Sequence, residues 1–451
     1  MLLKKEEKIL KRNIKRLQNN KVKIKNIQLK VKLIKMILQF FLLFIQLTVS
    51  IEFIHFTDIH YDMLMDATKY DESSGCRAYE QDPDSFLKEL LMKNQDKIKS
   101  FKQSIKSYSP YYGLYYCDSN RNLVNEAIQH SYKVSDHPAI LLISGDLAGH
   151  SQGDMNPVAL KEVFEMFHNR FPGIPIVYAM GNNDISPSYK TQCYDPRYEK
   201  YYEQLREHIP ESEKQAFIQH GTYIRHFNEF KLSVLAINTL HYSYKWDGED
   251  CGSFEYMRNA FSLAREKKHN VFVIGHFPIG VATYDCTLYL NESNHQTLID
   301  IFNENKDIIV ATSFGHNHRS EIKNVGDLLI TTAPAIPPIF GNNPGFRKYE
   351  YDYRKGILMD STEYYFQYGQ STAKQRGVWS DGISMRKQFN VTDVSPKSLK
   401  LIQEKILNEP DAYLKYSSMG NGYFDSLYKY KLCAIDSETK EDAARCYDET
   451  F

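Results

Sequence analysis

One event recurs along this chain: a short apolar run stops at a turn that carries an aspartate, asparagine or histidine. The first run, Ile51–Phe56, ends at Thr57-Asp58-Ile59-His60. Asp58 and His60 lie two residues apart where a strand ends, so both side chains can point the same way. A carboxylate beside an imidazole suits zinc, iron or manganese, although this pair alone is also common in ordinary turns. The pattern gains weight because it recurs after a glycine at Gly145-Asp146, Gly181-Asn182, Gly275-His276 and Gly315-His316-Asn317-His318.

Strands and helices alternate through the middle of the chain. Apolar runs predict strands at 139–144, 174–180, 232–237, 271–274, 308–311 and 328–332, and amphipathic patterns predict helices at 121–134, 157–170, 189–210 and 294–305. This alternation predicts an α/β architecture with the ligand-bearing turns along one sheet edge.

Three regions are expected. An N-terminal extension covers 1–50, the α/β domain covers 51–390, and a helical subdomain covers 391–451, with helices at 395–408 and 411–430. A polar, tyrosine-rich insertion at 66–120 is expected to form a rim beside the first ligand turn.

The formal net charge of zero conceals an uneven distribution. Residues 1–35 hold 13 Lys or Arg and 2 Glu, a net charge of +11, so residues 36–451 carry −11. The basic run is either a nucleic-acid-binding arm or, as we prefer, a low-complexity extension removed from the mature protein. The acidic remainder argues against nucleic acid as a general partner.

Residues 36–50 form an apolar core that ends in small residues, typical of a secretory signal and too short for a comfortable membrane span. We expect Met36 to be the true start; an uncleaved signal anchor is the alternative. We expect no stable membrane span in the mature protein, which is then secreted or lysosomal (vacuolar) and a monomer. Asn291-Glu292-Ser293 and Asn390-Val391-Thr392 are glycosylation acceptors consistent with this route.

The chain has seven cysteines and no C-x-x-C pair, so disulfides are expected rather than a structural zinc site. Neighbourhood in the sequence predicts Cys76–Cys117 and Cys433–Cys446. Cys251–Cys286 is expected because these residues flank one ligand-bearing loop region, which leaves Cys193 over.

The candidate metal ligands are too many for one zinc ion and suit two ions that share a bridging carboxylate. Two ions ~4 Å apart clamp a displacement at phosphorus and lower the pKa of a bridging water, so that hydroxide exists near neutral pH. Asp146 is the bridging candidate. The full set is Asp58, His60, Asp146, Asn182, His276, His316 and His318.

In this order, the motifs Asp-x-His, Gly-Asp, Gly-Asn-x-Asp, Gly-His and Gly-His-x-His resemble the calcineurin-type metallophosphoesterases. Within that superfamily, residues 51–448 are similar to the acid sphingomyelinase-like phosphodiesterases. The motifs that carry this likeness are Phe56–Asp62, His150, Gly275–Gly280, Phe314–Arg319, Asn342–Arg347 and Leu432–Ile435.

The resemblance implies a four-layer fold, two mixed sheets with helices outside, and a di-zinc centre in a metal-dependent phosphoric diester hydrolase. Asp58, His60, Asp146 and His318 would hold one ion, and Asp146, Asn182, His276 and His316 the other. His150 would contact the phosphate or protonate the leaving oxygen, or make a supporting hydrogen bond. The family usually has histidine where this chain has Asn183, which can donate a hydrogen bond but cannot carry a proton.

The expected substrates are small soluble phosphodiesters or nucleotides. Gly-Asn-Asn-Asp also resembles endopolyphosphatases, which favours phosphoanhydrides, and we expect that no lipid-loading saposin-like domain precedes residue 51. Sphingomyelin is the alternative. A secreted, catalytically silent metal-binding protein is the alternative from another class, and only Asn183 favours it.

Overall fold

The structure, a computed structural model, describes residues 29–36, 50–63, 65, 111–113, 115–246, 248–283, 286–418 and 433–450. The chain divides into two compact units, Met1–Ser50 and Ile51–Phe451. The predicted secretory segment and the tyrosine-rich insertion lie almost entirely outside the described residues. Among the described residues, no helix has the length and apolar character needed to cross a membrane.

The strands of the second unit are short and mostly buried along their whole length. They are β1 (Ser50–Phe56), β2 (Ile140–Ile143), β3 (Ile176–Tyr178), β4 (Tyr223–Phe227), β5 (Leu232–Ala236), β6 (Asn270–Ile274), β7 (Ile309–Phe314), β8 (Glu321–Val325), β9 (Leu328–Thr332), β10 (Gly345–Asp352), β11 (Ile357–Tyr365) and β12 (Ile383–Ser384).

The helices lie between these strands or follow them. They are α4 (Arg121–Val134), α5 (Asn156–Arg170), α6 (Pro196–Leu205), α7 (Lys214–His220), α8 (Ser253–Glu266), α9 (Glu292–Glu304), α10 (Tyr368–Lys374), α11 (Met385–Gln388), α12 (Pro396–Asn408), α13 (Pro410–Ser418) and α15 (Lys440–Thr450).

The strands form two six-stranded mixed sheets with the orders β12-β11-β10-β1-β2-β3 and β4-β5-β6-β7-β9-β8. In the first sheet β1, β2 and β3 are parallel, and β10, β11 and β12 pair in antiparallel fashion. In the second sheet β5, β6, β7 and β9 are parallel, with antiparallel β4 and β8 at the edges.

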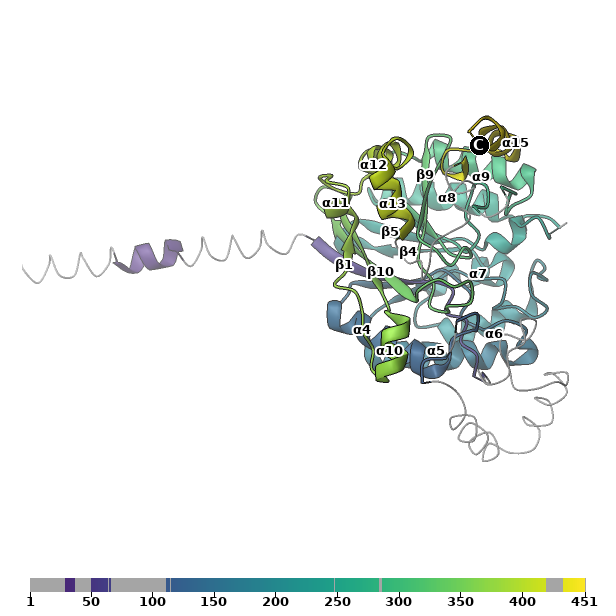
Figure 1. The fold of residues 1–451 in the computed structure, drawn as a ribbon, viewed down its shortest axis with the longest axis horizontal. Helices are drawn as coiled ribbons and strands as arrows, with labels where there is room; N and C mark the ends of the chain where they lie inside the picture. Colours follow the sequence, from purple (N-terminus) through teal and green to yellow (C-terminus); the bar gives the residue numbers. More distant parts are fainter. Residues whose placement is uncertain are drawn as a thin grey trace, which may run out of the picture. The chain divides into compact units, whose positions relative to one another are not determined.

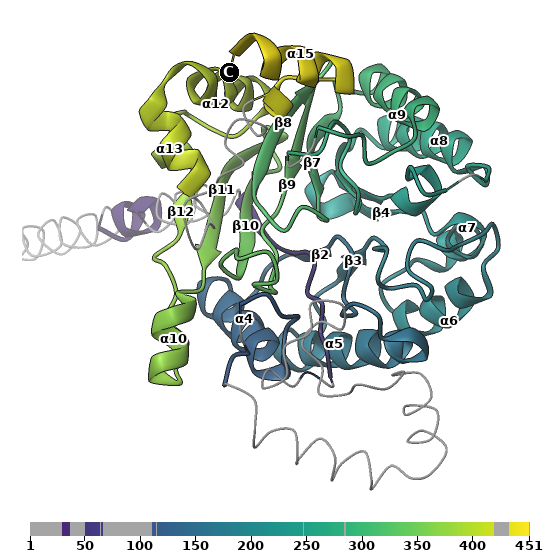
Figure 2. The same cartoon turned by 45° about the vertical axis from the view of Figure 1, so that its right-hand side comes forward.

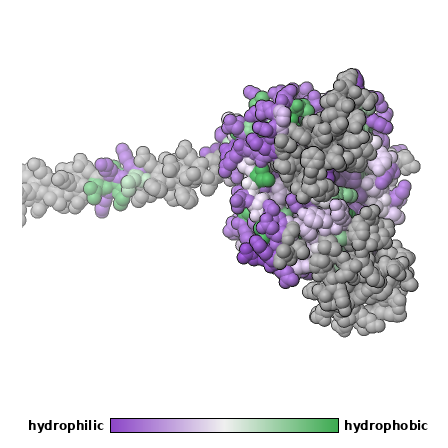
Figure 3. Space-filling model, in the orientation of Figure 1, coloured by the Kyte–Doolittle hydropathy of each residue, from purple (hydrophilic) through white to green (hydrophobic). Residues whose placement is uncertain are grey.

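The two sheets pack face to face. Phe53 of β1 meets Phe272 of β6 edge to face, with ring centres 6.2 Å apart. On the outer face of the first sheet, Phe56 packs on Phe167 of α5 at 5.1 Å. Helices α8, α9 and α12 contact the second sheet, so the unit has four layers, helix–sheet–sheet–helix (Figures 1 and 2). The described surface visible in Figure 3 is mostly hydrophilic or neutral, with small separate hydrophobic patches.

The predicted α/β class and four-layer arrangement are confirmed. Each predicted strand and helix of the middle region is present, but the helix expected over 189–210 is confined to Pro196–Leu205. Pro196 occupies its first turn, and the Asp195 side chain accepts a hydrogen bond from the Arg197 N–H, so the helix begins there. The C-terminal expectation is met by α12 and α13; residues 419–430 lie outside the described ranges.

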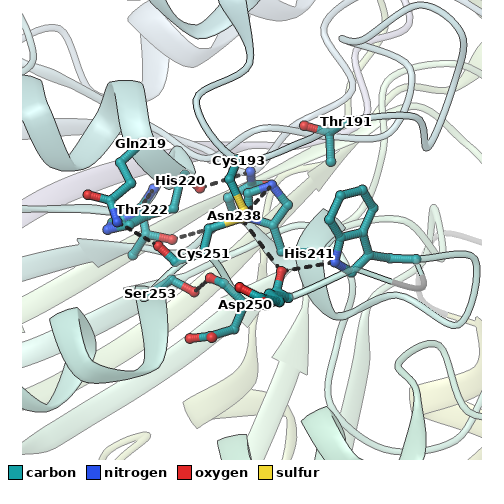
Figure 4. Close-up of a disulfide and its surroundings, with 12 residues drawn as sticks. Thr191, Cys193, Gln219, His220, Thr222, Asn238, His241, Asp250, Cys251 and Ser253 are labelled. Atoms are coloured by element: carbon teal, nitrogen blue, oxygen red, sulfur yellow. Dashed lines mark hydrogen bonds between the residues drawn. A yellow bond between two sulfur atoms is a disulfide. The ribbon is translucent and has the colours of Figure 1, made fainter.

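One predicted disulfide is wrong. Cys251 pairs with Cys193 rather than with Cys286, because the loop before α6 and the start of α8 meet at the end of α7 (Figure 4). There Tyr194 N–H donates to the Gln219 carbonyl, and Gln219 Nε2 donates to the Cys251 carbonyl.

Cys286 is buried in a small cluster with Val281, Ala434 and Ala443. Cys433–Cys446 is confirmed. Cys117 is disulfide-bonded, and its predicted partner Cys76 lies outside the described residues.

Candidate metal centre

All the predicted ligands lie just beyond the carboxyl ends of parallel strands. Asp58 and His60 follow β1, Asp146 follows β2 and Asn182 follows β3 in the first sheet; His276 follows β6, and His316 and His318 follow β7 in the second. Because the two sheets pack face to face, their ligand-bearing ends meet at one place.

Several ligands adopt left-handed backbone conformations that non-glycine residues seldom take: Asp58 (φ 45°), His60 (41°), Asp146 (52°), His316 (70°) and His318 (59°). Such conformations persist only where the surroundings impose them. Here Asp58 N–H donates to the Gly145 carbonyl and His60 N–H donates to the Asp146 carbonyl, each at 2.9 Å.

The glycines before the ligands allow the turns to approach one another. A Cβ on Gly145 would lie 2.6 Å from the Gly181 nitrogen and 2.8 Å from His276 Nδ1. A Cβ on Gly315 would lie 2.0 Å from Thr57 Oγ1. Any side chain at these two positions would therefore push the ligand turns apart.

Asp58, His60 and His318 form one group of ligand atoms within 4.8 Å of one another. Asp58 Oδ1 lies 3.4 Å from His318 Nε2 and 3.7 Å from His60 Nε2. Asp58 Oδ1 and both ring nitrogens of His60 are buried and make no hydrogen bond within the described part of the chain. A cation coordinated by Asp58 Oδ1 and one His60 ring nitrogen would satisfy both of these atoms, so the residues fit a metal ion.

Asp146, His276 and His316 form the second group. His276 Nδ1 lies 2.9 Å from the Ser144 carbonyl and must donate to it, which leaves Nε2 facing Asn182 Oδ1 at 3.0 Å and Asp146 Oδ2 at 3.3 Å. In the neutral imidazole, Nε2 carries a lone pair and is itself an acceptor. It therefore meets the two acceptor oxygens of Asn182 and Asp146 with no hydrogen between them. This arrangement requires a cation or an added proton.

Asp146 joins the two groups. Its Oδ2 lies 3.4 Å from His60 Nε2 as well as 3.3 Å from His276 Nε2. It is the carboxylate that the sequence predicted as the bridge, and its position between the groups fits that use.

The electrostatics of the site also favour positive charge. Burial disfavours the charged His276 imidazole, but the Asp146 and Asp58 carboxylates outweigh burial and raise its pKa to about 9. Burial, assisted by the neighbouring His276, lowers the pKa of His316 to about 3. One histidine of the second group therefore attracts a proton while the other presents a neutral nitrogen.

Asn183 hydrogen-bonds to the bridging candidate twice. Its N–H donates to Asp146 Oδ1 at 2.7 Å and its Nδ2 donates to Asp146 Oδ2 at 2.8 Å. Both contacts orient the carboxylate, which is a supporting role rather than proton transfer.

Asp184, the last residue of the Gly-Asn-x-Asp motif, stabilises the turn that carries Asp146. It is buried and accepts hydrogen bonds from the backbone N–H groups of Asp146, Leu147, Ala148 and Gly181, and from the Tyr178 hydroxyl. Burial and the neighbouring Asp146 carboxylate raise the pKa of Asp184 to about 6.

His150 lies beside the first ligand group. Its ring is parallel to that of His60, with centres 4.3 Å apart and an interplanar angle of 10°. Its Nδ1 lies 2.9 Å from Asp118 Oδ1, and its backbone N–H donates to Asp118 Oδ2 at 2.8 Å. The carboxylate thus fixes both the position of the residue and the orientation of its imidazole.

No pattern in the sequence singled out Asp118. It is fully buried, and burial opposes its charge, but His150 and His60 outweigh burial and lower its pKa to about 2. Its one sequence signal is its position after Cys117, whose disulfide anchors the segment. A single aspartate in a tyrosine-rich stretch carries no ligand spacing that would have identified it.

Two family comparisons match successive parts of the chain. Residues 51–320 match the calcineurin-like phosphoesterases, and residues 330–441 match the acid sphingomyelin phosphodiesterase C-terminal region. The chain is 25% identical to Sphingomyelinase phosphodiesterase D of Dictyostelium discoideum, over 88% of this chain and 94% of that protein. It is 26% identical to Cyclic GMP-AMP phosphodiesterase SMPDL3A of Bos taurus, over 72% of this chain and 76% of that protein.

Among solved structures, a dimetal phosphatase from Danio rerio is similar, with a TM-score of 0.43, 10% identity, and coverage of 74% of this chain and 98% of that chain.

Proposed function

Because this chain belongs to the calcineurin-like phosphoesterases, in the acid sphingomyelinase-like branch, and is a metal-dependent phosphodiesterase, we propose that its substrates are small and soluble. It hydrolyses phosphodiester or phosphoanhydride bonds of compounds such as nucleotides. The observation that carries the hydrolytic part of this proposal is the convergence of two ligand groups on Asp146, beside the Asp118–His150 pair.

We assign one divalent ion to Asp58, His60, Asp146 and His318 and a second to Asp146, Asn182, His276 and His316. Zinc is the ion we expect, because imidazole nitrogens with few carboxylates suit it. Bound there, such ions supply positive charge to a phosphoryl group and acidify water.

The protein's own contribution to proton transfer rests on His150. With its Nδ1 hydrogen-bonded to Asp118, the imidazole presents its Nε2 side to a leaving oxygen and can donate a proton there. Asn183 stands where the family usually has a histidine, and its side-chain amide donates a hydrogen bond to the Asp146 carboxylate. An amide cannot transfer a proton, so this position does not supply a second proton donor.

Two relatives support different substrates. The bovine relative is named a cyclic GMP-AMP phosphodiesterase, which favours a nucleotide-like substrate, whereas the Dictyostelium relative is named a sphingomyelinase phosphodiesterase. Sphingomyelin is therefore the second candidate.

The cellular setting we propose is the secretory pathway, ending outside the cell or in a lysosome or vacuole. The disulfides Cys193–Cys251 and Cys433–Cys446 support an oxidising compartment. In this proposal residues 1–50 are a leader that includes a secretory signal, residues 51–390 are the catalytic domain, residues 391–451 are a helical subdomain, and the mature protein is a glycosylated monomer.

Hydrolysis assays test the proposal. The full chain, produced in a secretory host and loaded with zinc, is given bis(p-nitrophenyl) phosphate, ATP and sphingomyelin at pH 5 and pH 7, with Asp146→Asn as the control. Cleavage of the first two substrates and not the lipid, lost in the variant, supports the proposal. Cleavage of sphingomyelin moves the assignment to the lipid, and a zinc-loaded protein without any turnover indicates a silent metal-binding protein.

A further inference from the structure

The Tyr189 side chain packs beside the second ligand group. Its ring stacks on Phe277, the residue after ligand His276, with ring centres 5.5 Å apart, and meets the His316 ring at 6.5 Å and nearly at right angles. Its backbone N–H donates to the Asn182 carbonyl at 3.3 Å. Tyr189 also has a φ of 66°, a strained value for tyrosine that persists only where the surroundings impose it. Together, these contacts fix the position of the Tyr189 ring.

A lysine covers this ring. Lys245 Nζ lies 3.6 Å from the centre of the Tyr189 ring, well within cation–π distance. The turn that carries Lys245 is anchored because Tyr244 N–H donates to the Tyr289 carbonyl at 3.1 Å, and the Tyr289 ring in turn meets the His316 ring at 5.5 Å. The ammonium is therefore held one aromatic ring away from a metal ligand.

No carboxylate neutralises this charge among the residues that the structure describes. Lys245 is exposed and forms no ion pair there. An ammonium has three N–H donors, and contact with a ring face leaves donors available to another group.

We propose that Lys245, held on Tyr189, binds an anionic group of the substrate other than the phosphate under attack. Lys245 thereby selects nucleotides and similar multiply charged phosphate compounds over phosphocholine esters. This inference rests on the proposed function and narrows its substrate class.

Lys245 on the Tyr189 ring should interact differently with nucleotides and with phosphocholine esters. Phosphate oxygens accept charge-assisted hydrogen bonds from an ammonium. A choline head group is instead recognised by an open aromatic face, whereas the Tyr189 ring already stacks on Phe277 and carries a cation that would repel choline.

Equilibrium binding tests the inference without requiring turnover. Calorimetry on the zinc-loaded full chain measures the dissociation constants of α,β-methylene ADP, in which a methylene group replaces the anhydride oxygen and resists hydrolysis, and of phosphocholine. Lys245→Met keeps most of the stem and removes the charge, Lys245→Arg keeps the charge, and Lys200→Met removes an exposed charge on α6 as the matched control.

We expect Lys245→Met to raise the dissociation constant of the nucleotide analogue about fivefold, which corresponds to the loss of a favourable exposed ion pair. Lys245→Arg should stay within about twofold of the parent, and Lys200→Met should have no effect. The parent protein should bind phosphocholine more weakly than it binds the nucleotide analogue. Lys245→Met should reduce the ratio between these two dissociation constants.

Equal losses in Lys245→Met and Lys200→Met, no measurable binding of the analogue to the parent, or equal affinity of the parent for both ligands would overturn the inference. Binding of the analogue with the expected loss, in a protein that hydrolyses nothing, would refute the proposed function and support only the part of the inference that concerns anion binding by Lys245.

Discussion

The most informative perturbation is Asp118→Asn, because it changes one oxygen to an amide nitrogen at nearly constant volume. Asp118 accepts from the His150 backbone N–H at 2.8 Å and lies 2.9 Å from His150 Nδ1. An asparagine has one acceptor oxygen and can keep only one of these contacts well. Its amide N–H groups face the other donor, so the imidazole must rotate or move its proton to the other nitrogen.

The expected effects differ between stability and catalysis. Loss of one buried hydrogen bond to a charged acceptor reduces the free energy of unfolding by ~2 kcal/mol. A misoriented His150 loses its contribution as a proton donor, and general acid catalysis contributes roughly 10²–10⁴-fold. We therefore expect kcat to fall by about 100-fold when the leaving group is a sugar alkoxide, which must be protonated.

The assay compares two leaving groups on the same enzyme. A dinucleoside phosphate releases an alkoxide, whereas bis(p-nitrophenyl) phosphate releases p-nitrophenolate, which leaves without a proton. The loss should be less than about tenfold for the second substrate. Asp136→Asn, at an exposed aspartate whose Oδ1 lies 3.2 Å from His137 Nδ1, is the matched control and should leave both rates unchanged.

An equal loss on both substrates would refute the reasoning, since it would indicate damage to metal or substrate binding rather than to proton donation. Retention of full activity on the dinucleoside phosphate would refute it as well.

The remaining predictions concern metal content, acid stability and the disulfides. His276→Ala should lower bound zinc from about two ions per chain to about one, measured by elemental analysis, and abolish turnover; two retained ions would contradict the ligand assignment. Burial and the neighbouring His168 lower the pKa of His208 to about 4 from its ordinary value of 6.5, so the native state binds this proton more weakly and loses stability as pH falls from 6.5 toward 4. In denaturant titrations, His208→Asn should remove ~1–2 kcal/mol of that loss, and an unchanged pH dependence would contradict it. Cys251→Ser opens a disulfide between residues 58 apart in sequence and should cost about 4 kcal/mol in unfolding experiments. Cys286→Ser is its control and should cost much less, so equal costs would contradict the assigned pairing.

The parallel strands and the ligand turns were predictable because their signals are local. Each buried strand is a short apolar run, and each ligand follows a strand end, so Asp58, Asp146, Asn182 and His276 could be read directly from the sequence. Their convergence follows from the rule that the carboxyl ends of parallel strands share one edge.

The remaining features depend on contacts between distant segments. Strands β10 and β11 alternate buried and partly exposed residues with many tyrosines and charges, so they lack a continuous apolar run. Asp118 acquires its position from His150, 32 residues later, and Cys193 reaches Cys251 only after α6 and α7 have folded back. No local pattern encodes these pairings.

The origin of the ligands in both sheets has a consequence for biogenesis. Asp58, His60, Asp146 and Asn182 follow strands of one sheet, and His276, His316 and His318 follow strands of the other. In the ligand sets that we propose, neither half of the sandwich can therefore assemble a complete ion site alone. High-affinity metal capture must therefore follow docking of the halves, and the captured metal then opposes their separation by mass action. In this assignment a chain that holds both ions has already docked its two sheets, and a chain that lacks metal would dock without the added stabilisation.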